Sequence, residues 1–122
     1  MKLYRVYLLR LENGNIKIGQ TSLPMAVRLA AIEFYAKTSR CEYNKGRHEV
    51  LATVSFIGTN KQARAIESGV QVMIQEHKSI VDIEESNDYL HITKKVTDAT
   101  LIRWFLDTVE QEAKHYKIEL EG

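Results

Sequence analysis

Two charged residues lie beside apolar helix positions, where an unpaired charge is costly. Arg28 comes three residues after Met25 and four before Ile32, so a helix would place it at the edge of an apolar face. Glu67 comes three residues before Val70, so it too would lie at the edge of the apolar face of its helix. Burying either charge alone costs several kcal/mol. The two side chains therefore either form a structural salt bridge or reach solvent, or they belong to a site that uses their charges.

Other common chemistries find no support in the chain. It contains neither a glycine-rich phosphate loop of the dinucleotide or P-loop type nor a Gly-x-Ser-x-Gly turn. The four histidines never fall at i, i+3 or i+4 spacing, and Cys41 is the only cysteine. The sequence thus predicts no zinc site of the usual pattern and no internal disulfide.

The first element expected to position a site is a β-hairpin. Residues 3–11 and 16–21 are rich in β-branched, aromatic and aliphatic side chains. Asn13-Gly14 lies between them, and this pair is a strong hairpin signal because both residues tolerate positive φ.

The hairpin has two candidate registers. A two-residue loop sets Arg10 opposite Lys17, and Tyr7 then points away from the Lys17 face. A three-residue loop with Gly14 in a left-handed bulge sets Leu9 opposite Lys17, and Tyr7 and Lys17 then share a face. Facing cations cost a few tenths to roughly 1 kcal/mol, so we predict the bulged register.

Helical and strand patterns alternate further along the chain. The predicted elements are a helix over about 24–36, a strand over 49–57, a helix over about 59–77, a short apolar strand at 89–92 and a helix over about 98–115. Thr59 and Gln62 match a capping box at the start of the second helix. Both faces of the 49–57 strand are apolar, as is typical of a central strand covered on both sides. We predict one α+β domain over residues 1–122, a small antiparallel β-sheet opened by the hairpin and flanked by helices.

Length and composition agree with one globular domain. The chain has 122 residues, of which 44% are hydrophobic and 27% charged. No apolar run approaches the ~20 residues of a membrane-spanning helix, and the start lacks the cleavage site of a signal peptide. We therefore expect a soluble cytoplasmic protein without a membrane partner.

Charge is divided unevenly along the chain. Residues 1–64 carry eleven Lys and Arg against four acidic residues, whereas residues 65–122 carry six against twelve. A basic half beside an acidic half permits binding of a polyanion on one face, although chance segregation of surface charge gives the same count. The candidate nucleic-acid contacts in the polar loop are Lys37, Arg40, Lys45 and Arg47.

Four pieces of sequence resemble a known family when they are taken together. They are Arg5-Val6-Tyr7, Lys17-Ile18-Gly19-Gln20-Thr21, Arg28 and Glu67. In order and spacing they resemble the GIY-YIG nuclease superfamily, most closely the phage and bacterial branch whose second motif reads Lys-Ile-Gly-x-Thr. Tyr7 matches the tyrosine of the first motif, Gly19 the glycine of the second and Arg28 the helix arginine. Glu67 matches the carboxylate that binds a divalent metal in that family.

The resemblance covers about residues 3–92 and leaves the 98–115 helix as an addition. Asp88-Tyr89-Leu90 is similar to the triplet that often follows the carboxylate helix in this branch. Arg5-Val6 replaces the Gly-Ile of the first motif, and Lys17 stands where the wider superfamily has its second tyrosine, although lysine is ordinary in this branch.

The resemblance implies a metal-dependent endonuclease that hydrolyses DNA, in a phage or bacterial cell. Tyr7, Lys17, Arg28 and Glu67 would be catalytic, and Glu67 would bind Mg²⁺ or Mn²⁺. A phenol with a pKa of ~10 is ionised in about one molecule in a thousand at neutral pH, so Tyr7 needs nearby positive charge to act as general base. The planar donor fork of Arg28 suits the developing charge on phosphoryl oxygens.

Two other functions stay open at this point. The same fold could hold nucleic acid through the basic loop without cutting it, or the acidic C-terminal half could dock a protein partner. So small a domain would bind DNA weakly unless it forms a homodimer or is recruited by another protein.

Overall fold

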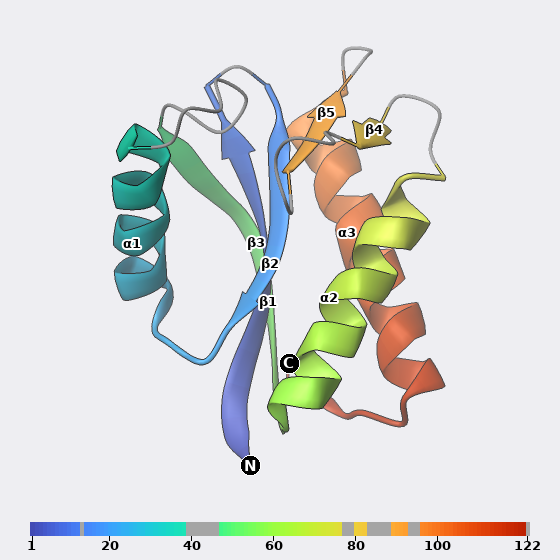
Figure 1. The fold of residues 1–122 in the computed structure, drawn as a ribbon. Coiled ribbons are helices and arrows are strands. Elements are labelled where there is room, and N and C mark those ends of the chain that lie inside the picture. Colours follow the sequence, from blue (N-terminus) through green and yellow to red (C-terminus); the bar gives the residue numbers. More distant parts are fainter. Residues whose placement is uncertain (13, 39–46, 77–79, 83–88, 93–95, 122) are drawn as a thin grey trace.

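The computed structural model describes residues 1–12, 14–38, 47–76, 80–82, 89–92 and 96–121. Its elements, in chain order, are β1 (Lys2–Leu11), β2 (Ile16–Thr21), α1 (Met25–Thr38), β3 (His48–Gly58), α2 (Asn60–Ile74), β4 (Ile80–Asp82), β5 (Tyr89–Ile92), α3 (Asp98–His115) and β6 (Leu120–Glu121). The strands form one six-stranded sheet in the order β4-β5-β2-β1-β3-β6, and every strand pair is antiparallel. The predicted α+β class, with a small antiparallel sheet flanked by helices, is confirmed (Figure 1).

The hairpin adopts the bulged register that the charges favour. Leu9 faces Lys17 and Tyr7 faces Gly19 across β1 and β2. Gly14 has a φ of 89°, in the left-handed region that glycine tolerates best. The prediction is confirmed, and it places Tyr7, Lys17 and Gly19 on one face of the sheet.

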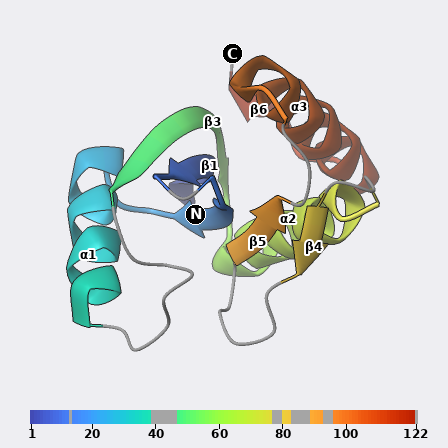
Figure 2. The ribbon, with the colours of Figure 1, turned by 90° about the horizontal axis from the view of Figure 1, so that it is seen from above.

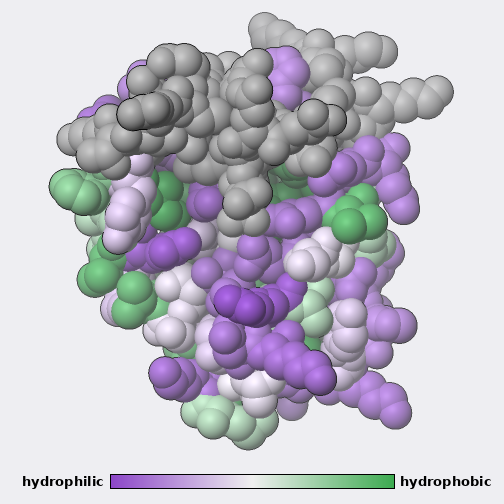
Figure 3. Space-filling view, viewed as in Figure 1, coloured by the Kyte–Doolittle hydropathy of each residue, from purple (hydrophilic) through white to green (hydrophobic). Residues whose placement is uncertain are grey.

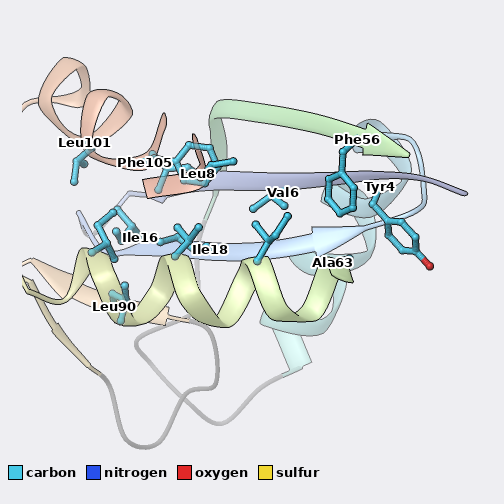
Figure 4. Packing of buried hydrophobic residues seen from close by; sticks show 14 residues of the cluster. Tyr4, Val6, Leu8, Ile16, Ile18, Phe56, Ala63, Leu90, Leu101 and Phe105 are labelled. Atoms are coloured by element: carbon cyan, nitrogen blue, oxygen red, sulfur yellow. The ribbon is translucent and has the colours of Figure 1, made fainter. Parts of the chain in front are cut away.

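Helices cover the two faces of the sheet unequally. Figures 1 and 2 show α1 alone on one face and α2 with α3 on the other. Alternate residues of β1 point to opposite faces, so Val6 and Leu8 join the larger core under α2 and α3 (Figure 4). Tyr7 and Leu9 instead join Ile32 of α1 in a small second cluster.

The coverage of β3 differs from the prediction. Both faces of this strand were expected to be buried, but Thr53 is exposed and Ile57 is 58% exposed. The reason is that β1 occupies the centre of the sheet, while β3 is bordered on its other side by β6 over only two residue pairs, at Ser55 and Phe56. One helix, α1, is too narrow to cover the whole of its face.

The helix predictions hold with small shifts. The capping box at Thr59 and Gln62 is present, and α3 spans 98–115 as predicted. The second helix ends at Ile74 rather than near residue 77. The strands β4 and β6 were not predicted, because segments of three and two residues are too short to show a pattern in the sequence. No helix in the described ranges has both the length and the apolar character that crossing a membrane requires.

The C-terminal helix is part of the main core, and this predicts a contrast between two neighbouring residues. Phe105 is fully buried, whereas Leu106 is 42% exposed. Phe105→Ala should lower the free energy of unfolding by about 3–5 kcal/mol, and Leu106→Ala should cost clearly less. Urea denaturation followed by circular dichroism measures both values. Equal losses would show that α3 does not pack as described.

Candidate functional site

The phenol of Tyr7 is positioned by a missing side chain on the neighbouring strand. Tyr7 faces Gly19, and its ring lies directly against that residue. A Cβ at position 19 would overlap the hydroxyl, and it would lie 2.8 Å from Cε2 of the ring. Only glycine therefore allows the Tyr7 side chain to cross β2 at this point.

Arg28 meets the same hydroxyl from α1. Its Nε donates a hydrogen bond to Tyr7 Oη at 3.3 Å, and the contact is partly buried. Within the described residues no other hydrogen bond or ion pair of the Arg28 guanidinium is found. Its two terminal nitrogens are thus available to an external acceptor.

Glu67 is brought to the other side of β2 by α2. Gln71, one turn further along α2, donates from Nε2 to the Ile18 carbonyl at 2.8 Å and to Glu67 Oε1 at 3.5 Å. The first bond satisfies β2 where its pairing with β5, which reaches only Ile16 and Lys17, has ended. Gln71 therefore fixes α2 to the strand and also contacts the carboxylate.

These side chains share one cavity. It has a volume of about 350 Å³ and is lined by Tyr7, Gly19, Gln20, Arg28, Arg64, Glu67 and Ser68. It lies at the β2 edge between α1 and α2, where Figure 3 shows a gathering of hydrophilic surface. The tyrosine, arginine and glutamate singled out in the sequence are thus brought together by three separate segments.

Tyr7 lines the cavity from a buried position. Its side chain has no exposed area although it lines the cavity. Its hydroxyl accepts the bond from Arg28 Nε, so the phenol and the guanidinium line the cavity side by side.

Lys17 lies outside this group. It is only 6% exposed, and among the described residues it is not one of those that line the cavity. It shares the Tyr7 face but is two residues along β2 from Gly19, a separation of roughly 7 Å. A direct catalytic role for Lys17 stays a prediction.

The basic loop is largely beyond the described residues. Arg40 and Lys45 fall outside them, as does Asp88 of the resembling triplet, and the Lys37 side chain is also outside. Arg47 is exposed just before β3, and its carbonyl accepts a bond from the Glu12 amide at 3.3 Å. Nucleic-acid binding by this loop stays a prediction.

Three residues of α2 at the site were missed in the sequence. Arg64, Ser68 and Gln71 stand three before, one after and four after Glu67. Together they follow the i, i+3, i+4, i+7 spacing of one helix face. That polar stripe, beside the buried positions of α2, was the available signal.

The donor set fits one hard divalent cation bound mainly by water. Among the described residues no three His, Cys, Asp or Glu side chains cluster as a metal site. Mg²⁺ does not need such a cluster, because it keeps several waters and takes one or two carboxylates plus substrate phosphate. Glu67 supplies one carboxylate. The Ser68 hydroxyl and the Gln20 amide line the same polar cavity and offer further oxygen ligands.

The contact between Tyr7 and Gly19 predicts strong coupling between the two positions. Gly19→Ala should lower the free energy of unfolding by about 1–3 kcal/mol, because the added methyl overlaps the phenol. In a Tyr7→Ala background the same substitution should cost much less, since the ring is gone. A double-mutant cycle from urea denaturation measures the coupling. Additive losses would contradict the close contact.

Comparison with protein-family models, with curated proteins and with solved structures finds no match to this chain.

Proposed function

We propose that this chain is a metal-dependent endonuclease of the GIY-YIG type that hydrolyses phosphodiester bonds in DNA. The observation that carries the proposal is the 3.3 Å bond from Arg28 Nε to Tyr7 Oη in the same cavity as Glu67. A base, a cationic donor and a carboxylate are the groups that phosphodiester hydrolysis needs.

Arg28 has two tasks in this proposal. Its positive charge beside the phenol favours the ionised form of Tyr7. Its terminal nitrogens form a planar fork that matches two phosphoryl oxygens. A lysine in this place would keep the charge and lose the fork.

Tyr7 receives the proton of the attacking water. As water attacks phosphorus, its proton passes to the phenolate oxygen, the new P–O bond forms and the bond to the leaving sugar oxygen breaks. The leaving oxygen then takes a proton from solvent. Arg28 stabilises the negative charge that builds on the phosphoryl oxygens during this change.

Glu67 is the residue that would hold Mg²⁺ or Mn²⁺. The bound ion supplies Lewis-acid stabilisation of phosphate charge. The bond from Gln71 restrains the Glu67 carboxylate, so that the chain fixes its own ligand before any metal binds.

Loss of the Glu67 carboxylate should abolish cleavage. Glu67→Gln keeps the shape and removes the charge that a cation needs, so nicking of supercoiled plasmid with Mg²⁺ or Mn²⁺ should fall below detection. Glu119→Gln, a matched change at an exposed residue far along the chain, should leave nicking unchanged. Gel electrophoresis of plasmid time courses measures both variants.

No nicking by the unaltered chain with either metal would contradict the nuclease proposal. The complete burial of the Tyr7 side chain favours one specific alternative, a domain of this fold that binds nucleic acid without cutting it. In that case affinity would fall steeply with salt and would be insensitive to Glu67→Gln.

Arg28→Lys should separate charge from geometry. The rate of cleavage should fall about 10²–10³-fold, as for loss of one preorganised transition-state donor, while affinity for the oligonucleotide changes little. Single-turnover cleavage and fluorescence anisotropy measure these two quantities. An equal loss in rate and affinity would mean that Arg28 only binds the ground state.

A further inference from the structure

A second guanidinium stands in the wall of the cavity opposite Arg28. Arg64 is on α2, exposed, and lines the cavity together with Glu67 and Ser68. No hydrogen bond or ion pair joins Arg64 to another residue in the described part of the chain. The only carboxylate among the lining residues, Glu67, is in contact with Gln71 instead.

The packing of α2 holds Arg64 at this place. Ala63, Ile66 and Val70 are fully buried against the sheet, which fixes how the helix is rotated. Arg64 then falls on the polar stripe one turn before Glu67. A rigid helix therefore presents an unpaired guanidinium to a polar cavity, and the acceptor that such a planar fork fits best is a carboxylate or a phosphate.

With a divalent cation on Glu67, the charges of the cavity would exceed the charge of one phosphodiester. Arg28 and Arg64 against Glu67 leave one net positive charge, which a divalent cation would raise to three, or to two with Tyr7 as phenolate. One phosphodiester brings a single negative charge. A polynucleotide strand brings another phosphate one nucleotide away, which supplies the missing counter-charge.

We propose that Arg64 binds the phosphate next to the scissile one on the same strand. The inference rests on the proposed function, because it takes the Arg28 side of the cavity as the place of the scissile phosphate. It defines the substrate class as a strand with at least two consecutive phosphates. Isolated phosphodiesters, such as a dinucleoside monophosphate, are then poor substrates.

The test neutralises one phosphate at a time. Oligonucleotides carrying a single methylphosphonate at successive positions around a mapped cleavage site are cut by the unaltered chain and by Arg64→Ala. The unaltered chain should lose about tenfold or more in rate when the phosphate on one side of the scissile bond is neutral, since a charge-assisted bond is lost. Arg64→Ala should be slow on the native strand and insensitive to that same replacement.

Two further variants isolate the effect. Arg64→Lys should recover part of the sensitivity because it keeps the charge. Arg103→Ala removes the same charge from an exposed position on α3, and it should respond to every methylphosphonate as the unaltered chain does. The inference is overturned if Arg64→Ala responds to each neutral phosphate as the unaltered chain does.

Binding distinguishes this failure from that of the nuclease proposal. The affinities of oligonucleotides with one methylphosphonate at each position in turn, measured by fluorescence anisotropy without divalent metal, give the same comparison without any cleavage or mapped site. A chain that cuts nothing but shows the position-specific loss of affinity, absent in Arg64→Ala, would refute the nuclease proposal and support the Arg64 contact. Cleavage by the unaltered chain, without a position-specific loss of affinity that depends on Arg64, would support the nuclease proposal and refute the Arg64 contact.

Discussion

The ring of Tyr7 rests on Gly19, and this contact decides where a polar group can reach the surface of the molecule. Tyr7 is in the middle of the sheet and wholly buried, so its hydroxyl would be stranded among apolar residues if β2 carried a side chain there. The gap at Gly19 lets the hydroxyl reach Arg28 and the adjoining cavity. The bulged hairpin register is what sets these two residues opposite each other.

An edge of the sheet is the natural place for such a site. The two faces are filled by apolar side chains, with α2 and α3 on one and α1 on the other. The pairing of β2 with β5 ends at Lys17. From Ile18 onward, β2 has no strand partner on that side among the described residues, and Gln71 donates a hydrogen bond to the Ile18 carbonyl. Helices from both faces can therefore contribute charged residues to one cavity without burying those charges in the core.

Local patterns were enough to predict most of the fold and half of the site. The repulsion between Arg10 and Lys17 was sufficient to choose the register, and the capping box at Thr59 marked the start of α2. Arg64 was missed although its spacing from Glu67 places it on the polar stripe of α2. The position of that stripe beside the β2 edge could not be predicted, because it is set by tertiary packing of Ala63, Ile66, Val70 and Ile74. The role of Lys17 stays a prediction, since sharing a face with Tyr7 does not fix how far its amine reaches along the strand.

The uneven layering has a consequence for the order in which the elements come apart. Among the described residues, α1 is held to the sheet by a small apolar cluster around Ile32 and by hydrogen bonds of Arg28 and Glu33, whereas α2 and α3 share the large core. Partial opening of a protein starts where few apolar contacts resist it, so we expect α1 to detach first on warming. Arg28 would leave with it, and the cavity would lose one of its walls while the sheet and the larger core stay folded.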